Sequence, residues 1–369
     1  MSSRLLSGLA AIAASLLVSL SPASASTMSV TDTMGRSVTV PAEAKRVLLG
    51  FYFEDFYAIG GASAYDRVVA ISRPTWEGWR GSQWKAYVAA NPKIEKLVDV
   101  GEVESGTFSI ETAIAAKPDV AILAAWQFRA LGDTVSKLEA AGIPVAVADY
   151  NAQTVEKHVA STLMIGRILG TEDRAKKLAD QYASAVADVR ARVKKAGGSA
   201  KNVYVELGNK SADGVGNSYG NGMWGGVIDL AGGNNIAKGK VENWGPLNPE
   251  YVIASAPEAV FIAGSYWAKK KKSVLMGFGV SKQQTRERLA PYAARPGWSA
   301  MPAVKSGQVH ALYHGGSRTL YDFTFLQYIA KVLHPEAFAD IDPVANHRQF
   351  YKTWLPIEAN GTFAVKLND

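Results

Sequence analysis

The chain has 369 residues, of which 48% are hydrophobic and 20% are charged, with no cysteine and a formal net charge of +7. This composition is typical of a soluble globular protein and excludes a disordered or coiled-coil chain. The length favours two domains, and the absence of cysteine excludes disulfide bonds.

The first 25 residues have the pattern of a secretory signal peptide. Arg4 supplies a positive start, residues 9–20 are apolar or small, and residues 23–25 read Ala-Ser-Ala, an A-x-A cleavage site. The apolar stretch is too short to span a bilayer comfortably, which makes a retained membrane anchor the weaker alternative. A lipoprotein would need a cysteine at the cleavage site. We therefore expect cleavage after Ala25 and a periplasmic protein that is neither a lipoprotein nor membrane-embedded.

The segments that follow alternate between strands and helices. Residues 28–40 alternate in polarity around Met34-Gly35, which predicts a β-hairpin. Residues 46–50 form a short buried strand pattern, residues 51–61 a helical one, and residues 67–71 a second strand. Strand–helix–strand alternation predicts βαβ units and a mainly parallel sheet.

An internal repeat indicates two lobes of similar plan. Residues 111–122 match residues 250–261 without a gap, and each copy reads as a short helix, a proline, an acidic residue and a buried strand. Each proline ends its helix because it lacks an N–H group and crowds the preceding turn. The alternative is a chance likeness between two common helix–strand units.

Residues 171–197 are predicted to form one long helix between the lobes. Acidic residues follow Thr171 and Lys194-Lys195 stands near the end, so the charges complement the helix dipole. The predicted fold class is α/β, with two lobes of mainly parallel central sheets flanked by helices and joined by this helix. We expect a signal peptide at 1–25, an N-terminal lobe at 26–170, the linking helix at 171–197, and a C-terminal lobe with its tail at 198–369.

Ligands of open α/β sheets bind at the carboxyl ends of the strands. Aromatic and arginine side chains follow several predicted strands, which suits a large, partly aromatic, anionic chelate. Phe51 and Trp79 are among these strand-end residues, but the ligand-binding set that we predict is Tyr52, Glu54, Arg73, Trp76, Arg80, Trp126, Tyr219, Trp224, His314 and Arg318. Two alternatives stay open. The tryptophans could pack the lobes, with Trp76, Trp79 and Trp84 on one helical face, and Arg318 could lie in a surface turn.

Other kinds of site have weaker support in the sequence. No pair of histidines has metal-ligand spacing, which argues against a directly bound metal ion. Residues 216–220 match the G-x-S-x-G pattern of a serine hydrolase, but Ser218 follows a glycine-rich loop instead of standing directly between a strand and a helix. Lys269 to Lys272 are interpreted as a solvated loop or helix end. Nucleic-acid binding is not expected, because no recognised motif is present.

The order and spacing of several segments resemble the periplasmic binding proteins of iron-complex, haem and vitamin B12 importers. The matching segments are 30–41 with 45–47, 66–69, 97–101, 111–119, 138–144, 230–236 and 301–309. The resemblance implies a cleft between lobes, a small closure motion, and docking on an ABC permease dimer driven by its ATPase. Trp126 aligns with an aromatic residue that contacts the ligand in the vitamin B12 protein.

The tail at 333–343 resembles the branch associated with ferric siderophores. We therefore expect a monomeric, non-enzymatic binding protein for a ferric-siderophore-type iron complex, with no cofactor of its own and iron only within the chelate. A haem- or cobalamin-binding protein of the same family is the alternative, with Tyr52, Tyr219 or His314 as an axial ligand for haem. A periplasmic serine hydrolase is a remote second alternative.

Overall fold

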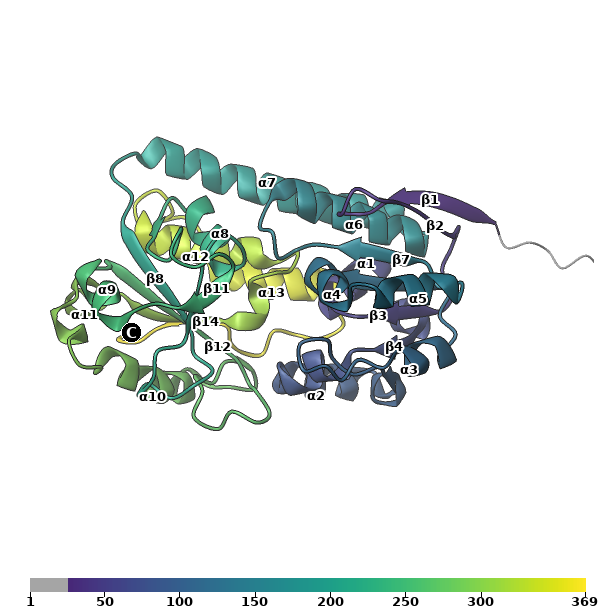
Figure 1. Ribbon diagram of the computed structural model, residues 1–369. Helices are drawn as coiled ribbons and strands as arrows, with labels where there is room; N and C mark the ends of the chain where they lie inside the picture. The colour runs from purple at the N-terminus through teal and green to yellow at the C-terminus, as the bar shows by residue number, and fades with distance from the viewer. Residues whose placement is uncertain (1–25) are drawn as a thin grey trace, which may run out of the picture.

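The computed structural model describes residues 26–369 (Figure 1). The predicted signal peptide lies outside the described residues. Within residues 26–369, no helix combines the length and the apolar character that a membrane crossing requires. The predicted hairpin is confirmed: β1 (Thr27–Thr31) pairs antiparallel with β2 (Ser37–Pro41), and Gly35 supplies the positive φ of 79° at the turn.

The first half of the chain forms a five-stranded sheet in the order β5-β4-β3-β6-β7, with every pair parallel. Its strands are β3 (Val47–Leu49), β4 (Val68–Ile71), β5 (Val98–Asp99), β6 (Val120–Ala124) and β7 (Val145–Ala148). Its helices are α1 (Phe53–Gly60), α2 (Gly81–Ala90), α3 (Ile110–Ala115), α4 (Ala125–Leu131), α5 (Thr134–Ala140) and α6 (Val155–Leu169). The prediction of a mainly parallel sheet is confirmed here.

The second half forms another five-stranded sheet, in the order β10-β8-β12-β14-β16, and only β16 is antiparallel to its neighbour. Its strands are β8 (Asn202–Leu207), β10 (Asn234–Asn235), β12 (Ala259–Gly264), β14 (Val309–Tyr313) and β16 (Ala364–Lys366). Two short pairs lie outside it, β9 (Asn217–Tyr219) with β11 (Trp244–Pro246) and β13 (Gly277–Phe278) with β15 (Gly361–Thr362). Its helices are α8 (Trp224–Leu230), α9 (Pro249–Ala254), α10 (Lys282–Ala293), α11 (Pro302–Lys305), α12 (Asp322–Leu333) and α13 (Pro343–Trp354).

The internal repeat corresponds to the same structural unit in both sheets. In the first copy α3 leads into β6, which lies between β3 and β7, and in the second α9 leads into β12, which lies between β8 and β14. The residues before the two prolines share an uncommon backbone conformation, with φ of 49° at Lys117 and 46° at Ala256. Equivalent positions therefore match in topology and in backbone, which supports two halves of one plan.

The predicted linking helix is present as α7 (Glu172–Ala196), and it runs along one side of both sheets (Figure 1). Its buried stripe includes Leu178, Tyr182, Val186 and Val189, the spacing expected of a helix with one apolar face. After the second sheet the chain returns toward the first half, because α12 packs against α7 and α13 contacts α1. The exact lobe boundaries stay predictions.

Candidate functional site

Two arginines from opposite halves of the chain meet at one aromatic ring. Phe51 lies two residues after the end of β3 and is buried. The guanidinium carbon of Arg80, which follows β4 after a π-helical turn at Pro74–Gly78, lies 5.0 Å from the centre of the Phe51 ring. The guanidinium carbon of Arg318, which follows β14, lies 4.9 Å from the same centre. This is cation–π distance, so the ring holds both cations at the strand ends of the two sheets.

Neither arginine has a carboxylate partner within residues 26–369, although Arg80 is only 3% exposed and Arg318 only 7%. Among the described residues, Nη2 of Arg80 and Nε of Arg318 lack hydrogen-bond partners, and Nη1 of Arg318 lies 3.8 Å from the sulfur of Met223. Burial, together with the nearby Arg80, lowers the pKa of Arg318 to about 10, so it remains cationic at neutral pH. A buried, unpaired cation is costly in folding free energy, and an anionic ligand would relieve that cost.

An aromatic wall adjoins these cations. Trp79 and Trp126 stack with ring centres 6.0 Å apart and an interplanar angle of 28°. Phe51 meets Trp126 edge-on at 5.5 Å and Trp79 at 6.2 Å. Nε1 of Trp126 is buried and has no hydrogen-bond partner in the part of the chain that the structure describes. The wall therefore offers apolar area and one N–H donor beside two guanidinium groups.

His314 provides another donor with a defined tautomer. Nε1 of Trp224 donates to Nδ1 of His314 at 3.3 Å, and the hydroxyl of Tyr219 lies 3.3 Å from the same nitrogen. Because an indole N–H can only donate, Nδ1 must accept, and the ring proton is assigned to Nε2. Burial, with Arg318 and Arg80 nearby, lowers the pKa of His314 well below its usual value and keeps the imidazole neutral. The Nε2–H group makes no hydrogen bond within the described part of the chain.

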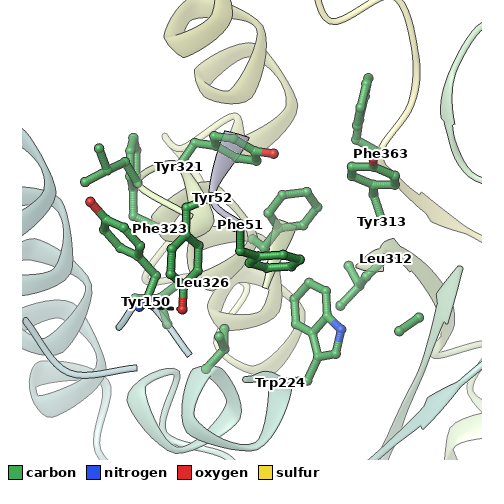
Figure 2. Close-up of a cluster of buried hydrophobic side chains, with 14 of the residues drawn as sticks. Phe51, Tyr52, Tyr150, Trp224, Leu312, Tyr313, Tyr321, Phe323, Leu326 and Phe363 are labelled. Carbon is green, nitrogen blue, oxygen red and sulfur yellow. Dashed lines mark hydrogen bonds between the residues drawn. The ribbon is translucent and has the colours of Figure 1, made fainter. Parts of the chain in front are cut away.

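Aromatic side chains from both halves belong to one buried cluster, which includes Phe51, Tyr52, Trp224, Tyr313 and Tyr321 (Figure 2). Tyr52 is held there by its hydroxyl, which donates to Oδ1 of Asn151 at 2.8 Å and accepts from the backbone N–H of Tyr150 at 3.2 Å. Its hydroxyl is therefore already engaged within the protein.

Three other predicted ligand residues lie elsewhere in the structure. Trp76 is fully buried and stacks on Phe53, with ring centres 4.4 Å apart. Arg73 donates through Nη2 to the backbone carbonyls of Glu95 and Leu97. Trp76 and Arg73 therefore make structural contacts and do not lie beside the Phe51 ring.

Glu54, the third, lies at the junction between the halves. Its carboxylate accepts four hydrogen bonds, from the side chains of Gln83, Tyr87, Tyr321 and Tyr351. Burial raises the pKa of Glu54, and the hydrogen bonds from the tyrosine hydroxyls act in the opposite direction. These donors tie α1 to α2, to the residue before α12 and to α13, which gives Glu54 a structural role.

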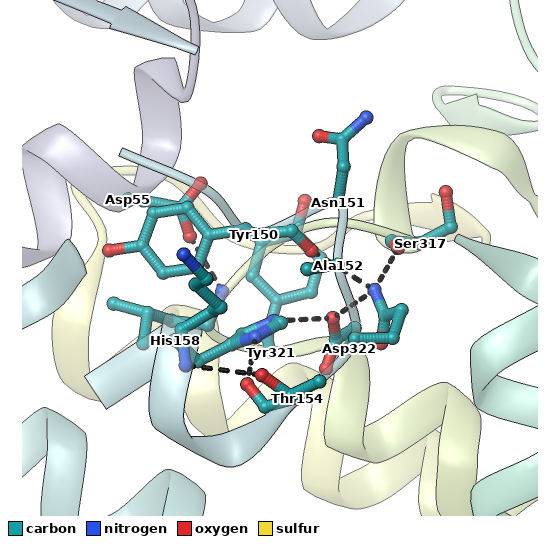
Figure 3. Close-up of polar contacts among 12 residues, drawn as sticks. Asp55, Tyr150, Asn151, Ala152, Thr154, His158, Ser317, Tyr321 and Asp322 are labelled. Carbon is teal, nitrogen blue, oxygen red and sulfur yellow. Dashed lines mark hydrogen bonds and ion pairs between the residues drawn. The ribbon is translucent and has the colours of Figure 1, made fainter. Parts of the chain in front are cut away.

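A second polar network positions the segment that carries Arg318 (Figure 3). Oδ2 of Asp322 lies 3.0 Å from both Nε2 of Gln153 and Nε2 of His158, and Gln153 also donates to the backbone carbonyl of Ser317. Oδ1 of Asp55 accepts the backbone N–H of Leu320 at 2.6 Å. The turn between β14 and α12 is thus fastened to the first half on both sides of Arg318.

The rule that ligands bind at the carboxyl ends of strands, called the strand-end rule below, identified Phe51 and Trp79. Neither residue was included in the predicted ligand set. The structure separates the three tryptophans that helical spacing would place together. Trp76 and Trp84 pack edge-on in the core, with centres 5.3 Å apart, whereas Trp79 ends the π-helical turn and faces Trp126. The irregular turn breaks the 3.6-residue period, and no sequence signal marks it except Pro74.

The G-x-S-x-G pattern does not form a nucleophile elbow. Ser218 lies within β9, is fully buried, and donates its hydroxyl to the backbone carbonyl of Val205 at 2.6 Å. A nucleophile elbow would expose this hydroxyl between a strand and a helix. Within residues 26–369, no group of three or more His, Cys, Asp or Glu side chains is arranged to hold a metal ion.

Comparison with known proteins identifies the family. The model of the periplasmic binding protein family matches residues 47–313. The TroA-like periplasmic binding protein FepB from Veillonella parvula is 32% identical, with coverage of 92% of this chain and 99% of that one, and superposes with a TM-score of 0.85. The chain belongs to the periplasmic binding protein family, whose members are the solute-binding components of ABC transporters. The predicted family resemblance and fold class are confirmed.

More distant relatives are named for different ligands. The molybdate-binding protein MolA of Haemophilus influenzae is 23% identical over 380 residues, covering 92% of this chain and 95% of the relative. Its molybdate-bound structure superposes with a TM-score of 0.69 over 90% of this chain and 99% of that one, at 15% identity. A periplasmic haem-binding protein from Pseudomonas aeruginosa shares the fold at 19% identity, with a TM-score of 0.57 over 79% of this chain and 93% of that one.

Proposed function

We propose that this protein binds an anionic solute between Arg80 and Arg318 and delivers it to an ABC permease and its ATPase. The observation that carries the proposal is the pair of buried guanidinium groups, one from each half, neither of which forms a direct ion pair with a carboxylate within the described residues. An anion that bridges them would pair both charges and join the two halves at the same time.

A ferric-siderophore-type complex is the ligand class that we favour. Ferric catecholates combine negative charge with aromatic rings, and the cations here lie beside the wall of Trp79 and Trp126. The rings would stack on this wall while the guanidinium groups neutralise the charge. The resemblance of the tail at 333–343 to the siderophore branch supports the same class. Iron would enter as part of the chelate.

A small oxyanion such as molybdate is the second candidate. Arg80 and Arg318 are both more than nine-tenths buried, which favours a compact ligand that reaches both guanidinium groups at once. The N–H groups of Trp126 and of His314 would add donors that suit an acceptor-only anion. The relationship to a protein named as molybdate-binding agrees with this alternative.

Haem has less support, because the three side chains suggested as axial ligands are engaged. The Tyr52 hydroxyl bonds to Asn151, and the Tyr219 hydroxyl lies against Nδ1 of His314. His314 accepts at Nδ1 and carries its proton on Nε2, so neither nitrogen offers a free lone pair to iron. Cobalamin has a single phosphodiester as its anionic group, which offers one negative charge to two guanidinium groups.

Titration of tryptophan fluorescence tests the proposal, with native mass spectrometry as an independent readout. The probes are a ferric tris-catecholate, molybdate, haem and a neutral ferric trihydroxamate. We expect at least one of the two anions to bind well and the neutral chelate to bind much more weakly. Tight binding of the trihydroxamate, or parent-like binding of the anions by an Arg80→Met, Arg318→Met double variant, would refute the proposal.

We also propose that the protein is exported and acts as a soluble periplasmic monomer. The family membership supports a periplasmic site of action, and the predicted cleavage after Ala25 gives a mature chain that starts at Ser26. N-terminal sequencing and the native mass of protein released by osmotic shock test this. A chain that retains Met1, or that stays with the membrane after a high-salt wash, would contradict it.

A further inference from the structure

The loop between β12 and β13 bridges the two halves beside the arginine site. Its first residues are tied to the turn that carries Trp79 and Arg80. The hydroxyl of Ser265 donates to the backbone carbonyl of Trp79 at 2.9 Å, and the N–H of Gly81 donates to the carbonyl of Tyr266 at 3.0 Å. The N–H of Ala268 donates to the carbonyl of Gly78 at 3.1 Å.

The residues that follow these contacts form a dense cationic surface. Lys269 to Lys272, which we call the lysine loop, are all exposed, and none takes part in an ion pair within residues 26–369. A further cation comes from the other half, because Nζ of Lys85 lies 5.7 Å from the centre of the Tyr266 ring. The π-helical turn to which the loop is hydrogen-bonded contains one acidic residue, Glu77.

The loop also lies on a particular side of the molecule. In Figure 1, the segment between β12 and β13 extends between α10 and α2, on the side away from α7. Since α7 runs along one side of both sheets, the lysine loop stands where the two halves are not covered by that helix. The sequence alone placed these lysines in an ordinary solvated segment. The segment just before the lysines is hydrogen-bonded to Gly78, Trp79 and Gly81, which flank Arg80 in the sequence.

We propose that the lysine loop attracts the anionic solute toward the arginine site and raises its rate of association. This rests on the proposed function, because it requires an anionic ligand. A cluster of exposed like charges beside a binding site raises the local concentration of the opposite charge and can speed association by about tenfold or more. The lysines remain hydrated while Arg80 and Arg318 hold the bound ligand, so the effect falls on the association rate and leaves the dissociation rate unchanged.

The test uses two variants of equal charge. In the loop variant, Lys269, Lys270, Lys271 and Lys272 are all changed to Gln. In the control variant, four exposed lysines on α7 and α11 are changed to Gln, namely Lys177, Lys194, Lys195 and Lys305. Stopped-flow tryptophan fluorescence gives the association and dissociation rates for molybdate and for a ferric tris-catecholate, at ionic strengths below and above about 0.15 M, where the screening length is about 8 Å.

We expect the association rate of the loop variant to fall about tenfold at low ionic strength and to approach that of the parent at high salt. Its dissociation rate should match the parent, and the control variant should match the parent in both rates. If the parent binds neither anion, the proposed function itself fails. If the parent binds but the two variants associate equally fast, steering by the loop is refuted. Faster dissociation from the loop variant alone would also overturn it, because the lysines would then contact the bound ligand.

Discussion

Buried charged groups occur in two neighbouring regions, and the two regions differ in how those groups are paired. At the junction between the halves, the Glu54 carboxylate accepts four hydrogen bonds and Asp322 contacts both Gln153 and His158. Asp55 there has one oxygen bonded to the N–H of Leu320 and the other without a partner among the described residues. At the arginine site, Arg80 and Arg318 are almost as deeply buried but have orphaned guanidinium nitrogens.

This difference separates stability from function. A buried polar group that is fully hydrogen-bonded has its desolvation cost offset within the fold, and such networks fix one arrangement of the packed elements. A buried cation without a partner lowers the stability of the ligand-free protein, and such groups persist where a ligand completes them. Substitutions in the first region should therefore unfold the protein, whereas substitutions in the second should weaken binding.

The largest expected effect is on Glu54. Glu54→Ala leaves the donors of Gln83, Tyr87, Tyr321 and Tyr351 buried without an acceptor, which should lower the free energy of unfolding by about 3–5 kcal/mol. Glu54→Gln keeps one oxygen acceptor and should cost less. Denaturant unfolding followed by circular dichroism measures both. Unfolding of Glu54→Ala at the same denaturant concentration as the parent would show that the network does not hold the halves together.

Arg318→Ala should weaken ligand binding and leave stability nearly unchanged, whereas Glu54→Ala should mainly lower stability. Loss of a charge-assisted hydrogen bond should weaken binding of an anionic chelate by about 1.5–3 kcal/mol, which is roughly ten- to a hundredfold in Kd. Stability should be unchanged or slightly higher, because the removed cation has no partner in the ligand-free fold. Lys177→Ala, at an exposed lysine of α7, is the control and should change Kd far less. Equal affinities of the two variants in isothermal titration would show that the ligand does not contact Arg318.

Acid should affect the junction through a buried histidine. His347 packs among Tyr321, Tyr351 and Phe363, and burial lowers its pKa from 6.5 to about 3. The unfolded chain therefore binds a proton between these values that the folded chain does not, so stability falls as the pH drops below 6.5.

This histidine should contribute about 1 kcal/mol of stability loss for each pH unit between pH 6 and 4. His347→Leu should flatten the pH dependence of the unfolding free energy by that amount. His334→Gln, at a partly exposed histidine, should flatten it less. An unchanged slope in His347→Leu would mean that His347 is already protonated in the folded protein.

The sequence predicted the fold well because the fold depends on local patterns. The helix–proline–strand repeat and the charge order of residues 171–197 both report on nearby residues, and both appear in the structure as α3–β6, α9–β12 and α7. Hydrophobic periodicity, proline stops and helix-dipole charges are all readable over short windows. Two equivalent β-sheet halves joined by a helix follow from them.

The candidate site was harder to predict because it depends on contacts between distant residues. The strand-end rule selected Arg80, Arg318 and Trp126, which all contact the Phe51 ring in the structure, and their role in binding stays a prediction. It could not separate Glu54 from them, because the three tyrosines that bond Glu54 are contributed by α2, by the residue before α12 and by α13. Whether a strand-end carboxylate is free or already hydrogen-bonded is decided by such long-range partners.

The smallest predicted effect separates the two ligand classes. Trp126 offers a ring, stacked on Trp79 and edge-on to Phe51, and an N–H group that has no partner. Trp126→Phe removes the N–H and the five-membered ring but keeps a six-membered π face, whereas Trp126→Leu removes the aromatic face as well. Each feature should contribute about 1 kcal/mol, or several-fold in Kd.

An aromatic chelate that stacks on this wall should tolerate Trp126→Phe and lose affinity in Trp126→Leu, because a phenyl ring still offers a π face. A small oxyanion held by N–H donors should instead lose the same affinity in both variants, because neither substitute donates a hydrogen bond. Trp76→Leu is the matched control, since the fully buried Trp76 packs on Phe53 and should alter stability without distinguishing the two ligands. Fluorescence-independent titration, such as calorimetry, is needed here because each variant removes a tryptophan. Parent-like Kd values for both ligands in Trp126→Leu would exclude the Trp79–Trp126 wall from the binding site. The proposed position of the ligand would then rest on the two arginines alone.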